Sequence, residues 1–340
     1  EISLGLVGSE MCIRDRSMRP DDTHFINTFV MDKDAVEDGN YGVYYHKQLR
    51  LSKKKMITMC QFTERELSRG ESLIDEFLTT LYRNEGVTPD NPNTWVRTQK
   101  FHPYDVYDAF DNYVSREIKE KYGEIALSAL ARMRVYMHRK GNSSHIHQEP
   151  YSYRDVLQTK ILTFDFGILE DSASNVDPVV FQLRVMDMEI INDEYVSYKK
   201  KHGEWTMKVL EESQVCSDYL LEIYVREMTL RRAQNQITFL LGNSISALQS
   251  KPIAKPLLDS INILICGVLN DSNQRYLVDE YDLGENNKKK LESIAGDTRF
   301  IHTFLLVNRM QQDATTALIK SYVPKKVRDG KLFKVVDVVQ

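Results

Sequence analysis

The stretch from Glu204 to Leu241 constrains the fold most, because its apolar side chains recur at intervals of three and four residues. That spacing places them along one side of an α-helix. Gly203 precedes the stretch and Gly242 follows it, as expected at helix boundaries. One helix of this length spans roughly 55 Å, more than the width of a small domain. The sequence therefore predicts a long amphipathic helix that serves as a bundle spine or as an interface.

The apolar stripe of this predicted helix suggests what the chain does. A stripe too long to be covered by one small domain needs a partner protein or a second copy of the chain. The expected interface residues are Trp205, Tyr219, Ile223, Leu230 and Ile237. The main functional prediction is thus a structural or interaction protein rather than an enzyme.

Composition excludes several classes. Hydrophobic residues make up 42% and charged residues 28% of the 340 residues, which are ordinary values for a globular protein. The apolar runs are far shorter than the roughly 20 residues that cross a bilayer, so we expect no membrane association. The net charge of -4 argues against a globally basic nucleic-acid binder.

The cysteines indicate a reducing environment. Cys12, Cys60, Cys216 and Cys266 lie far apart, and no two of them form a CxxC pair. This is neither a disulfide framework nor a zinc-binding pattern. We therefore expect a cytoplasmic location.

Residues 1–17 are predicted to be a non-native tail. The peptide GLVGSEMCIRDR within them resembles the translated sequencing adapter found at the ends of uncurated assembled sequences. Met18 is then a plausible start. The stretch fails as a signal peptide because its apolar part is short and no small-residue cleavage site follows.

Residues 18–158 are predicted to form a sheet-plus-helix region. Apolar residues between His24 and Phe62 read as two or three strands of a small antiparallel sheet. Thr63 and Glu66 have the spacing of a capping box, which predicts a helix that runs to Gly86. Further helices are expected from Pro103 and over residues 125–137.

Residues 159–340 are predicted to form a hairpin followed by helices. Alternating apolar residues at 161–168 and 179–185 indicate the hairpin, although residues 179–200 could instead be one helix. The long helix and further helices at 257–269, 274–281 and 298–322 make a C-terminal bundle, and residues 332–339 read as a strand. The fold class is therefore α+β and predominantly α-helical.

A histidine-rich segment is the candidate metal site. His145 and His147 would point the same way on an extended chain, and His138 or Glu149 would complete the site. Asp165, in the strand-like KILTFDFGIL, is a further candidate ligand, with Gln182 and Arg184 across the hairpin. This supports the alternative of a metal-dependent hydrolase or nuclease; solvated loop residues and a simple Asp165–Arg184 ion pair remain the other interpretation.

Lysine runs support a third function. Three runs of three lysines occur, and nucleic-acid contact is predicted for the first two. The third run is Lys288 to Lys290. The predicted contact residues are Lys53, Lys54, Lys55, Lys199, Lys200 and Lys201. Solvated turns are the alternative. No Walker loop, HExxH, GxSxG, GxGxxG or EF-hand pattern occurs, so no cofactor is predicted beyond a divalent metal.

Overall fold

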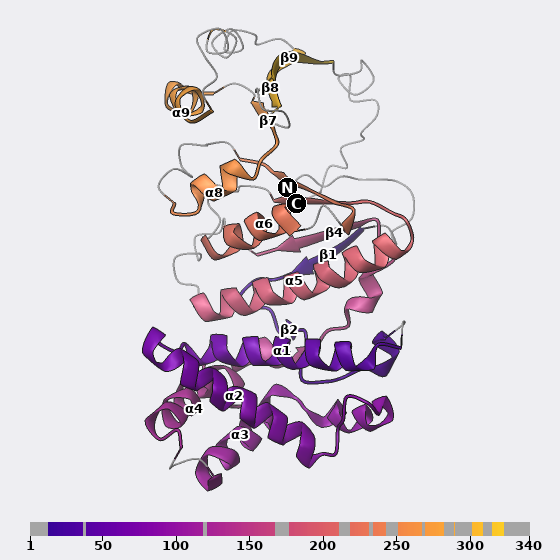
Figure 1. The fold of residues 1–340 in the computed structure, drawn as a ribbon, viewed down its shortest axis with the longest axis vertical. Helices are drawn as coiled ribbons and strands as arrows, with labels where there is room; N and C mark the ends of the chain where they lie inside the picture. The colour runs from indigo at the N-terminus through magenta and orange to yellow at the C-terminus, as the bar shows by residue number, and fades with distance from the viewer. Residues whose placement is uncertain are drawn as a thin grey trace, which may run out of the picture. The chain divides into compact units, whose positions relative to one another are not determined.

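The chain divides into two compact units in a computed structural model (Figure 1). The N-terminal unit is Cys12–Tyr198, and the C-terminal unit is Lys199–Gln340 together with Glu1–Met11. The structure describes residues 13–36, 39–117, 121–166, 177–210, 218–230, 234–242, 251–266, 269–281, 289, 301–308 and 315–322. The predicted boundaries at 17/18 and 158/159 stay predictions, since compactness alone does not define a domain that folds by itself.

Four helices build the larger core of the N-terminal unit. They are α1 (Tyr41–Cys60), α2 (Glu64–Asn84), α3 (Pro103–Glu117) and α4 (Glu124–Met137). Helix α4 packs against the other three. Large side chains fill the space between these helices. They include Phe77, Tyr82, Trp95, Phe110 and Met133, each of which is at most 2% exposed. Burial of such side chains is the main stabilising contribution.

The start of α2 follows from its capping box. The Glu66 carboxylate accepts a hydrogen bond of 2.9 Å from the Thr63 backbone N–H. The Thr63 side chain in turn accepts from the backbone N–H of Glu66. Gly86 follows the helix with a φ of +63°, a conformation that glycine adopts without strain. The predicted helix boundaries are confirmed here.

Helix α1 occupies residues for which an antiparallel sheet was predicted, and that prediction is wrong. The buried face of α1 includes Gln48, Ser52 and Lys55 besides apolar residues. Those polar residues interrupt the helical spacing of apolar residues, so the spacing of the remaining apolar residues resembles that of strands. The short strand β2 (His24–Phe25) is parallel to β3 (Glu149–Pro150). The 3₁₀ segments of this unit are η2 (Lys33–Ala35), η3 (Pro92–Lys100), η4 (Ser144–His147) and η5 (Tyr153–Val156).

A second, smaller core lies between a parallel strand pair and a long helix. Strand β1 (Ile13–Ser17) pairs in parallel with β4 (Ile161–Asp165). Ile190 and Ile191 of α5 (Pro178–Lys201) pack with Leu162 and Phe164 of β4. The predicted hairpin is therefore wrong, and the alternative helix over residues 179–200 is confirmed. The pairing of β1 does not test where the tail of residues 1–17 comes from.

The C-terminal unit alternates strands and helices. Strand β5 (Thr206–Leu210) pairs in parallel with β6 (Gln236–Leu240), and α6 (Asp218–Leu230) lies between them in sequence. Strand β7 (Ile263–Cys266) is antiparallel to β8 (Ile301–Asn308), which is antiparallel to β9 (Thr315–Tyr322). The remaining helices are α8 (Ala254–Asp259) and α9 (Asp271–Tyr281).

The predicted helix from Glu204 to Leu241 is thus wrong. Met207 and Val209 alternate with buried Thr206 and Lys208 in β5, as in a strand with one covered face. Among the described residues of this stretch, α6 is the only α-helix, and the strands on either side of it contribute apolar residues whose positions also fit a helical period. Over strands this short, apolar residues spaced for a strand can also match the spacing of a helix, which explains the error.

The predominantly helical α+β class is confirmed. The predicted C-terminal bundle is wrong, because residues 301–308 and 315–322 are strands. The strand predicted at residues 332–339 lies outside the described residues. Among the described helices, none has the length and apolar character needed to cross a membrane.

Candidate functional site

A buried ion pair joins α1 to α5 in the N-terminal unit. The side chains of Lys55 and Asp187 are each 4% exposed and form a salt bridge. Lys55 Nζ also donates to the carbonyl oxygen of Ile26 at 2.7 Å. Burial lowers the pKa of Lys55, although the charge of Asp187 opposes the shift. Asp187 therefore compensates a charge that would otherwise be costly to bury.

Arg184 lies one helical turn before Asp187 and is also buried. Its two terminal nitrogens donate to the carbonyl oxygens of Asp22 and His24. Its Nε is buried and has no hydrogen-bond partner within the described structure. Arg184 therefore fixes the backbone of residues 22–24 against α5.

The fixed segment carries a carboxylate and an imidazole in contact. Asp22 Oδ1 accepts hydrogen bonds from the His24 backbone N–H at 2.9 Å and from Nδ1 at 2.8 Å. Burial raises the pKa of Asp22, but the hydrogen bonds from His24 outweigh it and lower the pKa overall. Glu149 Oε2 lies 3.1 Å from His24 Nε2. His24 is thus held between two carboxylates.

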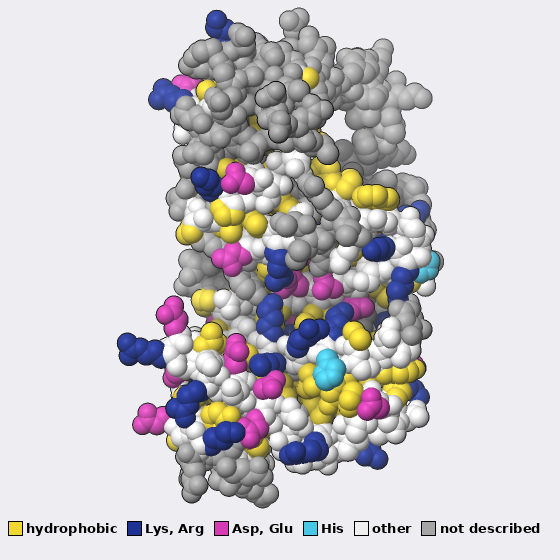
Figure 2. Space-filling view, viewed as in Figure 1, with side chains coloured by type: hydrophobic (Ala, Val, Ile, Leu, Met, Phe, Trp, Pro, Cys, Tyr) yellow, Lys and Arg dark blue, Asp and Glu magenta, His cyan; other side chains and the backbone are white. Residues whose placement is uncertain are grey.

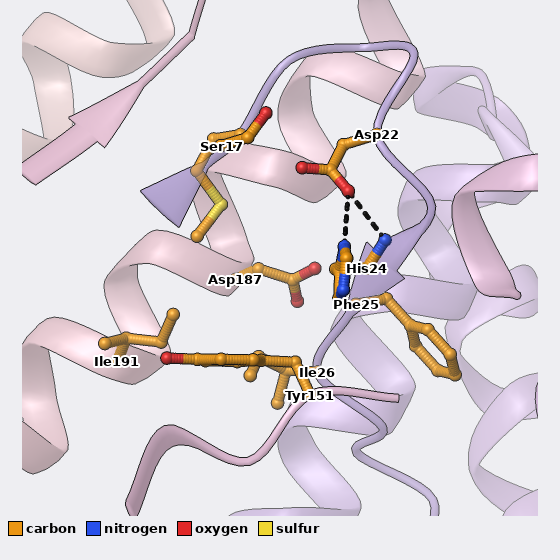
Figure 3. A pocket seen from close by; sticks show the side chains of 9 residues that line it. Ser17, Asp22, His24, Phe25, Ile26, Tyr151, Asp187 and Ile191 are labelled. Atoms are coloured by element: carbon orange, nitrogen blue, oxygen red, sulfur yellow. Dashed lines mark hydrogen bonds and ion pairs between the residues drawn. The ribbon is translucent and has the colours of Figure 1, made fainter. Parts of the chain in front are cut away.

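These side chains line a cavity of about 240 Å³ (Figure 3). Asp22, His24 and Asp187 form its polar wall, and Ile26, Ile191 and Tyr151 contribute apolar surface. Ser17 also lines it; this last residue of β1 pairs with Asp165, the last residue of β4. The cavity therefore borders the carboxyl end of a parallel strand pair, where α/β sheets usually bind ligands.

The structure gives the predicted metal ligands separate partners. His145 Nε2 lies 3.0 Å from the carbonyl oxygen of Pro20, and Asp165 forms an ion pair of 2.8 Å with Arg19. Glu149 contacts His24. His138 lies edge-on to the ring of Tyr107. Within the ranges that the structure describes, no three His, Cys, Asp or Glu side chains are arranged to hold a metal. The metal site stays a prediction.

His147 has a different environment from the other histidines. It is 4% exposed, and neither ring nitrogen has a hydrogen-bond partner among the described residues. Its ring packs edge-on against Phe25 at 5.0 Å between centroids. Burial, reinforced by the charges of Lys55 and Arg184, lowers the pKa of His147 well below its usual value. A neutral core imidazole is the simplest description.

The predicted nucleic-acid contacts are largely engaged within the protein. Lys53 and Lys54 lie 3.3 Å and 3.6 Å from Asp75 and Glu189, and Lys55 is buried. Lys199 pairs with Glu204 at 2.9 Å, while Lys200 and Lys201 are exposed. Dark blue and magenta side chains are interspersed on the face shown in Figure 2. The nucleic-acid contact stays a prediction, and Lys288 and Lys290 lie outside the described residues.

The predicted interface residues do not form one stripe. Trp205 precedes β5 and is 65% exposed, and Ile237 in β6 is 47% exposed. Ile223 is buried in α6, which also contains Tyr219 and Leu230. The prediction of a continuous helical interface fails because the helix that would align these residues does not exist.

In the C-terminal unit, β5 and β6 form another parallel strand pair. The two strands are parallel and Leu210 is in register with Leu240, so their carboxyl ends lie at one edge. Glu211 and Glu212 directly follow Leu210 in the sequence. Sequence reasoning did not single out these two glutamates because it assigned both strands to a helix. Alternation within residues 206–210 was the available signal.

No family model matches the sequence, and no curated protein matches it either. Several solved structures, however, are similar to this chain. VirB4 of Thermoanaerobacter pseudethanolicus is similar with a TM-score of 0.56 and 14% identity, covering 92% of this chain and 78% of that chain. Plasmid coupling protein TrwB, in complex with the non-hydrolysable GTP analogue GDPNP, is similar with a TM-score of 0.50 and 12% identity, covering 93% and 75%. Identities this low establish similarity of fold alone.

These similarities correct the main functional prediction. A structural protein built around one long helix is contradicted, because the fold is that of VirB4 and TrwB and residues 204–241 contain β5, α6 and β6. One of the two similar structures holds a nucleotide analogue. Residues 204–241 therefore provide the ends of two parallel strands and not a helical stripe.

Proposed function

We propose that this chain is a nucleoside triphosphatase of the motor type, in which nucleotide hydrolysis drives the movement of a macromolecule. The observation that carries the proposal is the similarity of fold over nearly the whole chain to TrwB, whose structure contains a GTP analogue. The similarity to VirB4 over 92% of the chain supports it. Nucleotides generally bind where the carboxyl ends of parallel strands meet.

The strand end of β5 has suitable chemistry for the proposal. Glu211 and Glu212 follow Leu210 in the sequence, and the structure does not describe residues 211–217. Carboxylate oxygens are the ligands that Mg²⁺ prefers, and acidic residues after a strand hold the Mg²⁺ of many nucleotide-hydrolysing proteins. When bound there, Mg²⁺ would neutralise phosphate charge. The role of these two residues is to hold the ion and to orient water.

One expected part is missing from the sequence. The pattern GxxxxGK[ST], whose backbone N–H groups and lysine hold phosphates, does not occur in the 340 residues. We therefore expect this chain to bind Mg²⁺-nucleotide weakly, with a Kd on the order of 0.1–1 mM. Without that loop, we expect most of the affinity to depend on Mg²⁺, which Glu211 and Glu212 would hold.

Binding of fluorescent GDPNP to the 340-residue chain tests the proposal, with fluorescence anisotropy measured with Mg²⁺ and with excess EDTA. We expect Mg²⁺-dependent binding that weakens about tenfold or more when Glu211→Gln and Glu212→Gln are combined, because the amides do not bind the ion well. The control is Glu222→Gln, an exposed glutamate on α6, which should leave binding unchanged. Absence of Mg²⁺-dependent binding, or equal Mg²⁺-dependent binding by the double variant, would contradict the proposal.

A further inference from the structure

The cavity of the N-terminal unit contains a buried carboxylate with hydrogen-bonding capacity to spare. Asp187 is 3% exposed and lines the cavity. Among the described residues, Lys55 Nζ is its hydrogen-bonding partner, through Oδ1. In Figure 3 the carboxylate extends from α5 toward His24 across the cavity. An ionised carboxylate accepts several hydrogen bonds, so Oδ2 remains available to a donor in the cavity.

We propose that this cavity binds a nucleobase, with an N–H group of the base donating to Asp187. Ile26 and Ile191 supply apolar surface for the faces of a flat ring. Tyr151 supplies an aromatic ring, and its backbone N–H donates to the carbonyl oxygen of Phe25 at 2.7 Å, which fixes its position. Stacking on an aromatic ring contributes favourably for any base.

The size of the cavity agrees with a fragment rather than a large ligand. Its volume of about 240 Å³ is below the roughly 300–1,000 Å³ usual for sites that enclose a drug-sized molecule. A single base fits this description. Ser17, which also lines the cavity, belongs to the predicted non-native tail, and none of the recognising groups named here comes from that tail.

The charges around Asp187 favour a neutral ligand over a cation. Lys55 is paired with Asp187, and Arg184 lies one turn away on the same helix. Both side chains are positive and buried, and Asp22, the other carboxylate of the cavity wall, already accepts hydrogen bonds from His24, so a further cation near Asp187 would meet repulsion in a low-dielectric environment. A neutral amino or imino group donates a hydrogen bond without that cost. This distinguishes a base from an amine or guanidinium ligand.

The inference goes beyond the proposed function. It requires no phosphate, no Mg²⁺ and no contribution from Glu211 or Glu212. A nucleoside without phosphates tests it directly, and its binding should not depend on Mg²⁺. The proposed function concerns only the part of GDPNP binding that is lost with excess EDTA, so the failure of either proposal leaves the other intact.

The test is an isothermal calorimetric titration of the 340-residue chain with adenosine and with guanosine. Caffeine is the matched control, because it is a purine without any N–H donor, and agmatine is the cationic control. We expect the nucleosides to bind with a Kd below about 1 mM and both controls to bind at least about tenfold more weakly. Equal binding of caffeine, preferential binding of agmatine, or no binding of either nucleoside would overturn the proposal.

Variants locate the binding. Asp187→Asn replaces an acceptor oxygen by an amide that donates, and we expect at least about tenfold weaker nucleoside binding. Tyr151→Leu leaves the Lys55 pair intact and should weaken binding about threefold to tenfold, so the proposal stays testable if Asp187→Asn fails to fold. Asp75→Asn, an exposed change on α2, should have no effect. Unchanged affinity in folded Tyr151→Leu would place binding elsewhere and reject this cavity.

Discussion

The two units each bury a lysine–carboxylate pair, but they cover it differently. Lys55 and Asp187 join two long helices, and both residues are enclosed by the helical core of the N-terminal unit. Lys208 of β5 and Glu227 of α6 lie 2.6 Å apart beneath a strand pair whose other face exposes Met207, Val209 and Ile237. Parallel strands are usually covered on both faces. The difference teaches that a buried ion pair in this protein can lie between two long helices or beneath a strand pair whose other face is exposed.

The largest expected effect is at the N-terminal pair. Asp187→Ala leaves Lys55 buried without its partner, which should lower the free energy of unfolding by about 3–5 kcal/mol. Urea unfolding followed by Trp95 fluorescence measures this, because Trp95 is 1% exposed within the same unit. Loss of less than about 1 kcal/mol would show that Lys55 finds other compensation.

The pH dependence of that variant follows from the pKa of Lys55. Burial lowers the folded pKa below the usual 10.5, so the unfolded state binds more protons between the two values. Stability then rises as pH increases through this window. The Asp187→Ala variant should therefore regain part of its lost stability on the alkaline side, and a flat profile up to pH 10 would contradict this.

A smaller effect is expected at the C-terminal pair. Glu227→Ala removes the partner of Lys208, but the Lys208 ammonium also lies 4.4 Å from the centre of the Tyr224 ring. That cation–π contact keeps some compensation, so we expect a loss of about 2–3 kcal/mol. Hydrogen exchange of the α6 amides measures the local opening. A loss equal to that of Asp187→Ala would remove the distinction between the two pairs.

The smallest effect is expected on the open face of the strand pair. Met207 is 65% exposed and Ile237 is 47% exposed. Met207→Thr and Ile237→Thr should each change the free energy of unfolding by at most about 0.5 kcal/mol, because little apolar area is lost from the interior. Thermal unfolding of both variants checks this. A large loss would mean that the face is covered in solution.

Local signals in the sequence predicted part of the fold correctly. The Thr63–Glu66 capping box and Pro103 at the start of α3 act within one helical turn, so the sequence shows them directly. Helix α1 was missed because Gln48, Ser52 and Lys55 occupy its buried face. Their partners, such as the Thr28 carbonyl for Ser52 at 2.7 Å, lie elsewhere in the chain.

The candidate sites depended on long-range contacts that no local pattern encodes. Lys55 and Asp187 are 132 residues apart, and the cavity combines side chains from residues 17–26 with Tyr151, Asp187 and Ile191. The histidine segment attracted attention by composition, but the fold directs His145 to a backbone carbonyl and buries His147. Strand alternation in β5 and β6 was visible, yet the intervening helix made one continuous period the simpler interpretation.

The contact between Arg184 and the carbonyl of His24 has a consequence for synthesis on the ribosome. The two residues are separated by 160 positions. At about 5–20 residues per second, the segment around His24 waits roughly 10–30 s before its anchor has been translated. During that time Ile26, which packs with Ile190 and Ile191 in the finished protein, has no helix α5 to cover it. Chaperones that bind short apolar segments would find a target there.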